Sequence, residues 1–253
     1  LLLCCPSRIS EILALPADCE ITQIDGKGIE RYGLRFYSVK GYGPNIKWIP
    51  RVMIPVAKKA IRRLLSLSQN ARALAHWCEK HPDKFYRHEL CPTVDEKAKL
   101  TVVQVCHALG YNLFDHKSCV LKIKRTSLDG GKSFLNHNDY NYSLSNLWEI
   151  ISSNFSRDFP WYDKEKSIKF SNALCLLNTD QFSLSRMTSI FTFYKPTKSF
   201  FFSDIQRKKS YEMNYKNIFS RYGYYDDEGK PLLIRSHQPR HLLNTIAHYG
   251  EMS

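Results

Sequence analysis

Hydrophobic positions follow a helical spacing in the first part of the chain. Apolar side chains recur at this spacing, at Leu1, Leu2, Cys5, Ile9, Ile12, Leu13 and Leu15. Side chains spaced in this way share one face of a helix. Pro16 lacks the backbone N–H that a continuing helix needs, so the helix should end there. The pattern predicts a helix over residues 1–15 with one buried face.

The pattern changes to short extended runs between residues 20 and 50. The runs EITQI, YGLRFYSV and IKWIP are rich in β-branched and aromatic residues and are separated by glycine-containing segments. The first turn contains Gly26 and Gly28, and the second contains Gly41 and Gly43. Because glycine adopts the backbone conformations of tight turns, the segment predicts a small antiparallel sheet.

A long helix is expected after Pro55. The sequence VAKKAIRRLLSLSQNARALAHWCEKH alternates basic and apolar residues at helical spacing. A basic face of this kind is usually solvated, but it could equally lie along a phosphate backbone.

The character of the sequence changes near residue 91, which indicates a boundary. Residues 100–110 have the spacing of a short helix that ends at Gly110. Small helix-turn-helix DNA-binding units have this pattern, and so do ordinary capped amphipathic helices, so both interpretations stay open. Residues 126–142 are rich in Ser, Asp, Gly and Asn and predict a loop, and SLSNLWEII predicts a further helix.

Charge narrows the class of partner. The chain has a net charge of +13 and a pI of about 9.3, which favours a polyanion, with nucleic acid ahead of an anionic membrane. Residues 192–222 interleave Lys and Arg with Phe and Tyr, as suits a backbone-neutralising surface. No apolar run approaches the roughly 20 residues of a membrane span. No glycine-rich phosphate loop points to a nucleotide.

The eight cysteines are scattered, and no secretory signal accompanies them, so reduced thiols are expected. Cys78 and His81, together with His88 and Cys91, have ligand types that suit zinc. The intervening segment contains Pro82 and bulky aromatic residues, and the alternative is packed thiols beside surface histidines. No metal is predicted, and these four residues are the weak candidate for one.

Three short segments carry candidate phosphate chemistry. Arg8 precedes Glu11 by three residues on the first helix, so the two are expected to pair. Lys40 lies at the predicted tip of the second hairpin, where its ammonium could reach a ligand. His237 and Arg240 lie together near the end of the chain, where Pro239 and Ser236 suit the start of a helix.

The segments SRISEILAL, VKGYGPNIKWIP and HQPRHLLNT, in this order, resemble the catalytic domain of phage-integrase-type tyrosine recombinases. The matching blocks are residues 1–65 and 232–253, roughly a third of the chain. The resemblance implies site-specific DNA recombination or integration, as in a mobile element, through a 3′-phosphotyrosyl intermediate. It implies that Arg8 and Arg240 clamp the scissile phosphate with His237, that Lys40 is the general acid, and that Glu11 orients Arg8.

The resemblance also implies partners and a fold. Double-stranded DNA is the expected partner, with self-assembly on DNA, no membrane, no cofactor, and a cytoplasmic, nucleoid-associated location. The expected fold is α+β and mostly helical, a recombinase core with a small antiparallel sheet. Two core segments, 1–65 and 232–253, would flank a large, mainly helical insertion over residues 66–231 whose role the resemblance does not give.

The nucleophilic tyrosine of the family is expected after the second arginine and beyond Ser253. Tyr249 follows Arg240 too closely and is expected on the same helix, so the chain is interpreted as a fragment of a longer recombinase. Two other classes stay open. One is a DNA-binding module without catalysis, and the other is an enzyme similar to type IB topoisomerases.

Overall fold

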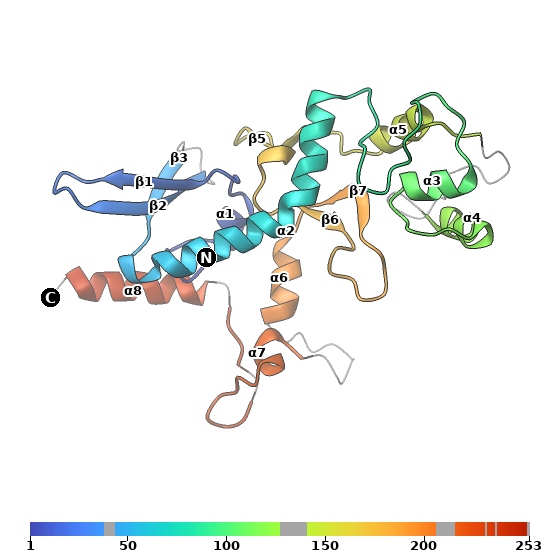
Figure 1. Cartoon of the computed structure of the whole chain (residues 1–253). Helices are drawn as coiled ribbons and strands as arrows, with labels where there is room; N and C mark the ends of the chain where they lie inside the picture. The colour runs from blue at the N-terminus through green and yellow to red at the C-terminus, as the bar shows by residue number, and fades with distance from the viewer. Residues whose placement is uncertain (38–43, 127–140, 206–215, 231, 236, 252–253) are drawn as a thin grey trace. The chain divides into compact units, whose positions relative to one another are not determined.

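The chain is an α+β protein, with helices and small antiparallel sheets, as the sequence predicts (Figure 1). The structure is a computed structural model, and it describes residues 1–37, 44–126, 141–205, 216–230, 232–235 and 237–251. The fold separates into two compact units. Unit 1 comprises residues 1–66 and 195–253, and unit 2 comprises residues 67–194.

The division differs from the sequence-based segments at one end. Residues 195–231, which the sequence analysis places in the insertion, group with unit 1. The first division, after Ser66, lies beside the boundary expected after residue 65. The roles assigned to these segments stay predictions.

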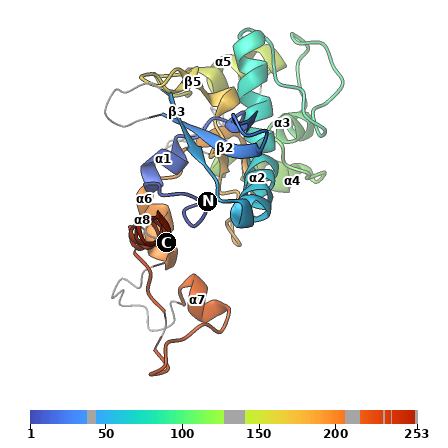
Figure 2. The ribbon, with the colours of Figure 1, turned by 90° about the vertical axis from the view of Figure 1, so that its left-hand side faces the viewer.

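Unit 1 contains one sheet and several helices. Its elements are α1 (Ile9–Leu13), β1 (Glu20–Ile24), β2 (Glu30–Tyr37), β3 (Pro44–Trp48), the 3-10 helix η1 (Arg51–Met53), the first turns of α2 (Ile54–Lys80), α6 (Lys198–Ile205), α7 (Ile218–Arg221) and α8 (Gln238–Glu251). Figures 1 and 2 show α1 beside the sheet.

The first helix is shorter than the sequence predicts. Arg8 has extended backbone angles, φ −86° and ψ 149°, and α1 begins only after it. Pro6 accounts for the late start, because its ring disfavours helical angles at the preceding residue and it has no N–H to donate. The buried positions Ile9, Ile12 and Leu13 still form one face, so the predicted face is correct where the helix forms.

The sheet has the order β1-β2-β3, and both pairs of strands are antiparallel, which confirms the predicted small sheet. Its central strand buries Leu34 and Phe36. Gly33 lies opposite Trp48 in the register of β2 and β3. A methyl group at Gly33 would lie 2.9 Å from side-chain atoms of both Ile46 and Trp48, so the two strands approach here as only glycine allows.

Helix α2 has 27 residues and begins with Pro55 in its first turn, where the missing N–H removes no hydrogen bond. Its first turns bury Ala57 and Ile61 and expose the neighbouring basic residues Lys58, Lys59, Arg62 and Arg63. Within the described ranges, no helix combines the length and the apolar character needed to cross a membrane.

Unit 2 is not purely helical. Besides the last turns of α2, it contains α3 (Val102–Ala108), α4 (His116–Arg125), α5 (Leu144–Ser153), β4 (Trp161–Asp163), β5 (Ile168–Lys169), the 3-10 helix η2 (Phe170–Asn172), β6 (Leu177–Thr179) and β7 (Ser189–Tyr194). β4 pairs with β5 and β6 pairs with β7, so two short hairpins accompany the helices. The sequence predicted α3 and α5 and missed these hairpins.

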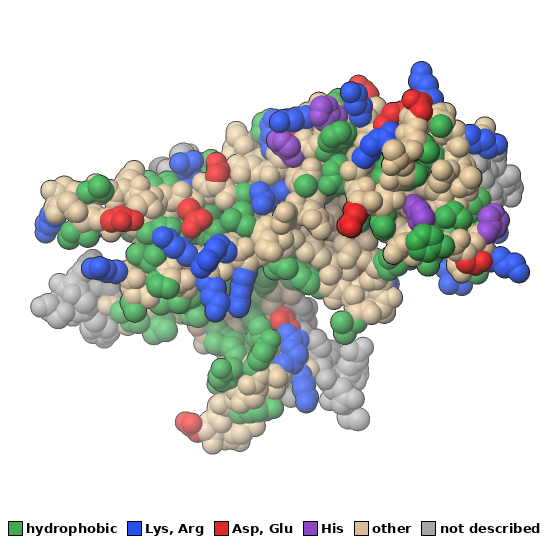
Figure 3. All heavy atoms as spheres, viewed as in Figure 1, with side chains coloured by type: hydrophobic (Ala, Val, Ile, Leu, Met, Phe, Trp, Pro, Cys, Tyr) green, Lys and Arg blue, Asp and Glu red, His purple; other side chains and the backbone are tan. Residues whose placement is uncertain are grey.

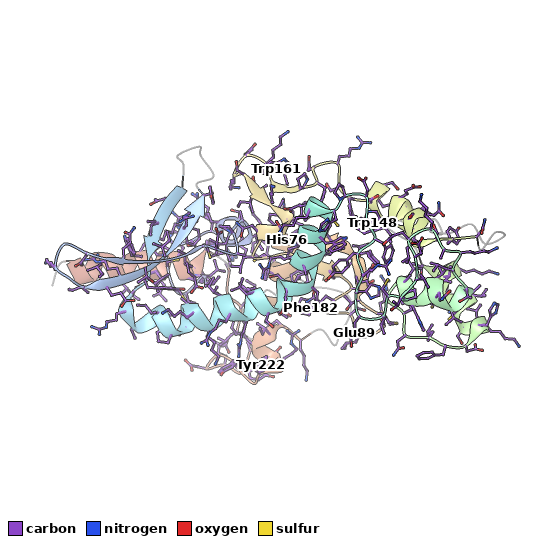
Figure 4. All side chains as sticks on the ribbon, turned by 45° about the horizontal axis from the view of Figure 1, so that its top comes forward. His76, Glu89, Trp148, Trp161, Phe182 and Tyr222 are labelled. Carbon is purple, nitrogen blue, oxygen red and sulfur yellow. The ribbon has the colours of Figure 1, made fainter. Side chains whose placement is uncertain are left out.

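An aromatic cluster forms the core of unit 2. Phe85, Trp148 and Phe191 are buried and meet edge to face, with ring centroids 5.4 to 6.5 Å apart. Figure 4 shows Trp148 among densely packed side chains. The indole N–H of Trp148 donates to the carbonyl of Pro82 at 2.5 Å, which satisfies its buried polar atom.

We predict that Gly33→Ala destabilises unit 1. The new Cβ would press on Ile46, Trp48 and the backbone oxygen of Lys47 (3.0 Å), and overpacking of this kind costs about 1–3 kcal/mol. The free energy of unfolding, measured by urea denaturation, should fall by that amount. Gly26→Ala is the control, because nothing lies within 4 Å of its added methyl. Equal stabilities of the two variants would contradict the prediction.

Candidate functional site

The carboxylate of Glu11 joins α1 to the sheet of unit 1. Its Oε2 accepts a hydrogen bond from the backbone N–H of Arg8 at 2.8 Å and another from Nζ of Lys47 at 2.7 Å. The first bond caps an N–H at the start of α1 that has no partner within the helix. The second ties α1 to β3.

The ammonium of Lys47 is fully engaged. Besides Glu11, it donates to the carbonyl of Pro6 at 3.0 Å and to the hydroxyl of Ser7 at 3.3 Å. It also lies 4.4 Å from the ring centroid of Phe36. An ammonium has three N–H donors, and these three hydrogen bonds use all of them. Lys47 therefore has a structural role and no donor left for a ligand.

Charges around Glu11 keep it ionised. Burial would raise the pKa of this carboxyl, but the hydrogen bonds from Lys47 and from the backbone of Arg8, and the charges of Lys47 and Arg240, outweigh burial and lower the pKa below 4.5. The contribution of Arg240 is informative, because α8 and α1 come from opposite ends of the sequence. Arg240 therefore lies within electrostatic reach of the residue that caps Arg8.

Arg8 occupies the N-cap position of α1, and its side chain is exposed. The sequence predicted an ion pair between Arg8 and Glu11. In the structure, Glu11 contacts the backbone of Arg8, while its ion-pair partner is Lys47. Within the described part of the chain, no carboxylate pairs with the guanidinium of Arg8.

The first turn of α8 carries the candidate residues of the C-terminal segment. His237 lies just before the helix, and its ring meets that of His241 at a centroid distance of 5.7 Å. Arg240 is half-buried beside the buried Pro239. The start of the turn is held by the Gln238 side chain, which accepts from the N–H of Arg235 at 2.6 Å.

Several predicted features concern residues outside the described ranges. Lys40 is one of them, and the described strands on either side of it are paired up to Tyr37 and Pro44. The expected cap at Ser236 is another.

Tyr249 and Arg240 belong to the same helix, α8, as the sequence predicts.

A basic surface accompanies these residues in unit 1. Lys58, Lys59, Arg62 and Arg63 are exposed on the first turns of α2, and Figure 3 shows Lys and Arg side chains gathered over this helix. Lys58 lies 5.1 Å from the ring centroid of Tyr32, which orients it over the sheet. Such a surface suits a phosphate backbone.

The four residues weighed as zinc ligands do not form a metal site. Cys78 is buried in the core of unit 2, and burial raises the pKa of its thiol to about 12, which disfavours the thiolate that zinc requires. Both ring nitrogens of His88 already form hydrogen bonds: Nε2 with the carbonyl of Ala108 and Nδ1 with the N–H of Leu90. His81 packs on Trp77, and the thiol of Cys91 faces the carbonyl of Pro92. Among the residues described, no group of three potential ligands could hold a metal ion.

The arrangement can neutralise a phosphate. Arg8 and Arg240 each offer a planar guanidinium that can donate two parallel hydrogen bonds to phosphate oxygens, and His237 adds an exposed imidazole.

The sequence analysis did not identify Lys47, although its position in the hairpin could have indicated its role. In the register of the hairpin Lys47 lies opposite the buried Leu34, so a charged residue on the core face needed a partner.

No protein-family model, no curated protein and no solved structure matches the chain. A function therefore has to be argued from the residues themselves.

We predict that Glu11→Gln lowers the free energy of unfolding by about 1–3 kcal/mol at neutral pH, because a charge-assisted bond is lost and the partly buried ammonium of Lys47 loses its counter-ion. The folded-state pKa of Glu11 is lowered, so its stabilisation is complete above 4.5 and disappears as pH falls through the lower, folded-state value. Urea denaturation across this range should show wild type and variant converging in acid.

The control is Glu30→Gln, an exposed carboxylate of the same unit. It should change stability by no more than about 0.5 kcal/mol. A constant difference between wild type and Glu11→Gln at every pH would argue against an ionised Glu11 as the cause.

Proposed function

We propose that unit 1 belongs to the catalytic domain of a tyrosine recombinase of the phage-integrase type, acting on double-stranded DNA. In this proposal Arg8 and Arg240 clamp the scissile phosphate together with His237. Lys40 donates a proton to the leaving 5′-hydroxyl. The nucleophile in this proposal is a tyrosine hydroxyl.

The proposal is supported by one electrostatic observation: the charge of Arg240 is among those that lower the pKa of Glu11. Glu11 also accepts from the backbone N–H of Arg8, although α8 and α1 are distant in sequence. A clamp on one phosphate would require the two guanidinium groups to converge. The order of the sequence motifs supports the same interpretation.

Lys47 explains how Arg8 stays available to a ligand. A carboxylate beside an arginine would ordinarily bind its guanidinium and compete with phosphate. Here the counter-charge of Glu11 is Lys47, at 2.7 Å, and Glu11 reaches Arg8 only through the backbone N–H. Among the described residues no carboxylate pairs with the guanidinium of Arg8, so in this proposal its hydrogen-bond donors serve an external anion.

The chemistry follows from these charges. The tyrosine oxygen attacks phosphorus, releases its proton to solvent and forms the phosphotyrosyl P–O bond. The attack adds negative charge to the phosphoryl oxygens, which the two guanidinium groups would stabilise. The P–O bond to the 5′-oxygen breaks, and that oxygen takes a proton from Lys40. The 3′-phosphotyrosyl bond preserves the energy of the phosphodiester, so rejoining needs no nucleotide.

We predict that the chain binds duplex DNA through Arg8 and Arg240. The double variant Arg8→Gln/Arg240→Gln should reduce the slope of log affinity against log salt by about 2, because each neutralised phosphate releases counterions. The measurement is fluorescence anisotropy with a labelled duplex of about 30 base pairs at several salt concentrations.

The matched control removes two arginines of unit 1 that are already paired with carboxylates. Arg31 binds Asp25 and Arg221 binds Asp204, both at 2.7 Å. Arg31→Gln/Arg221→Gln removes the same charge and should leave the slope within about 0.5 of wild type. If both double variants reduce the slope equally, net charge and not a phosphate clamp explains binding.

We predict that Arg240→Lys removes most DNA cleavage and leaves DNA affinity within about threefold. Lysine keeps the charge and loses the bidentate fork. Cleavage is measured as covalent protein–DNA adduct on a nicked duplex, beside the melting temperature of the same preparation.

Cleavage near the wild-type rate at normal stability would remove Arg240 from the active site. DNA binding without any covalent adduct would favour a non-catalytic module. Relaxation of one supercoiled duplex without exchange between two would favour an enzyme similar to type IB topoisomerases.

A further inference from the structure

We propose that α3 and α4 of unit 2 form a second DNA-binding element, a helix-turn-helix in which α4 lies in the major groove of double-stranded DNA. The proposal stands on the residues of unit 2 and does not depend on the phosphate clamp proposed for unit 1. It assigns a role to the segment that the recombinase resemblance leaves unexplained.

The two helices are sharply defined. The N-cap of α3 is Thr101, whose hydroxyl accepts from the N–H of Gln104, while the Gln104 side chain accepts from the N–H of Thr101. The N-cap of α4 is Asp115, whose carboxylate accepts from the N–H of Ser118 at 2.8 Å. Gly110 turns the chain after α3 with φ +87°, and a Cβ there would lie 2.7 Å from Ile190. These signals fix where each helix begins and where the first ends.

The connection between the helices is tied to both of them. The carbonyl of Leu113 accepts from the ring of His107 on α3 at 2.9 Å and from the thiol of Cys119 on α4 at 3.4 Å. Tyr111 accepts from Thr126 at 3.1 Å, and its ring centroid lies 4.4 Å from Nζ of Lys122. The connection, residues 109–115, is longer than a minimal turn, and these contacts hold it in one conformation.

The inner faces of the helices belong to the core of unit 2. Val105, Cys106 and Ala108 of α3 are fully buried, as are Cys119 and Ile123 of α4. Because this packing fixes the rotation of α4, it also fixes which side chains face outward.

The outward face of α4 is basic and contains no acid. The exposed residues of α4 are His116, Lys117, Ser118, Leu121, Lys124 and Arg125. Lys117, Leu121 and Lys124 follow the spacing of one helical face. The sequence of α4 contains no Asp or Glu, and the neighbouring Asp115 is occupied by the helix cap. In Figure 3, basic and histidine side chains surround apolar ones where Figure 1 draws α4.

Two exposed apolar side chains distinguish this face from an ordinary solvated one. Leu121 is 54% exposed in the middle of the basic residues, and Phe114 is 74% exposed at the turn before them. Apolar side chains among cations suit a DNA groove, where the cations meet phosphates and an apolar group can contact a thymine methyl.

Duplex DNA fits this surface better than duplex RNA does. A helix with its side chains is about 10–12 Å across and the major groove of B-DNA is about 12 Å wide, so α4 can enter it. The major groove of A-form RNA is deep and narrow and does not admit a helix. Base edges would then meet the middle of α4, and phosphates its basic ends.

The test uses the whole chain and a pool of duplex DNA with about 20 randomised central base pairs, from which bound sequences are selected and enriched. The variant Lys117→Ala/Lys124→Ala/Arg125→Ala should lose about tenfold or more in affinity for the enriched duplex at about 150 mM salt. It should also bind the enriched and the starting pools alike. All three side chains are exposed, so the thermal midpoint should stay at the wild-type value.

The matched control removes two lysines and one arginine that are exposed elsewhere in unit 2. Lys84→Ala/Arg157→Ala/Lys164→Ala loses the same charge and should change affinity by less than about threefold. Equal loss in the two triple variants would overturn the proposal, because net charge would then account for binding.

Methylation of guanine N7 with dimethyl sulfate reports the major groove of the enriched duplex. Wild type should protect N7 positions, and the α4 variant should lose this protection. Arg8→Gln/Arg240→Gln should retain it, so failure of the clamp and failure of the α4 element give different results. No enrichment of any duplex, or α4-dependent binding that is tighter to RNA of the same sequence, would overturn the proposal.

Discussion

The ion pair between Glu11 and Lys47 is the interaction on which the candidate site of unit 1 depends. One carboxylate oxygen caps the start of α1 through the N–H of Arg8 and accepts from the ammonium of β3. The backbone of Arg8 is thereby fixed, and the charge that could have bound its guanidinium is already balanced. The charge of Arg240, on α8, also contributes to the lowered pKa of Glu11.

The two units offer different kinds of contact to a polyanion. In the proposed function, unit 1 supplies guanidinium groups for one phosphate, and it also exposes the lysines and arginines of α2. Unit 2 presents a helix whose outward face mixes cations with Leu121, a combination that can meet base edges. Phosphate contacts position a protein on DNA and base contacts select the sequence, so the units would divide these tasks.

Much of the fold could be predicted where local chemistry decides it. Turn glycines and short apolar runs predicted the sheet, and Gly110 marked the end of α3. The sequence overestimated α1, because the apolar spacing continued through Pro6 although proline disfavours a helix before it. It missed the hairpins of unit 2, whose strands β4 and β5 have three and two residues and carry little periodic signal.

The candidate site was less predictable because its geometry comes from tertiary packing. Arg8 and Glu11 have the spacing of an ion pair on one helix, yet Arg8 precedes the first turn and Glu11 turns toward Lys47. The sequence of α3 could not distinguish an ordinary amphipathic helix from the first helix of a helix-turn-helix. The pattern of buried apolar residues on α3 is the same in both cases. What distinguishes them is the outward face of α4, and that depends on which of its residues the core of unit 2 buries. The Glu11–Lys47 pair is only partly buried, with side chains 11% and 22% exposed. Glu11 caps the backbone N–H of Arg8, and among the described residues no carboxylate pairs with the Arg8 guanidinium, so under the proposed function this ion pair positions Arg8 and leaves its guanidinium to the phosphate.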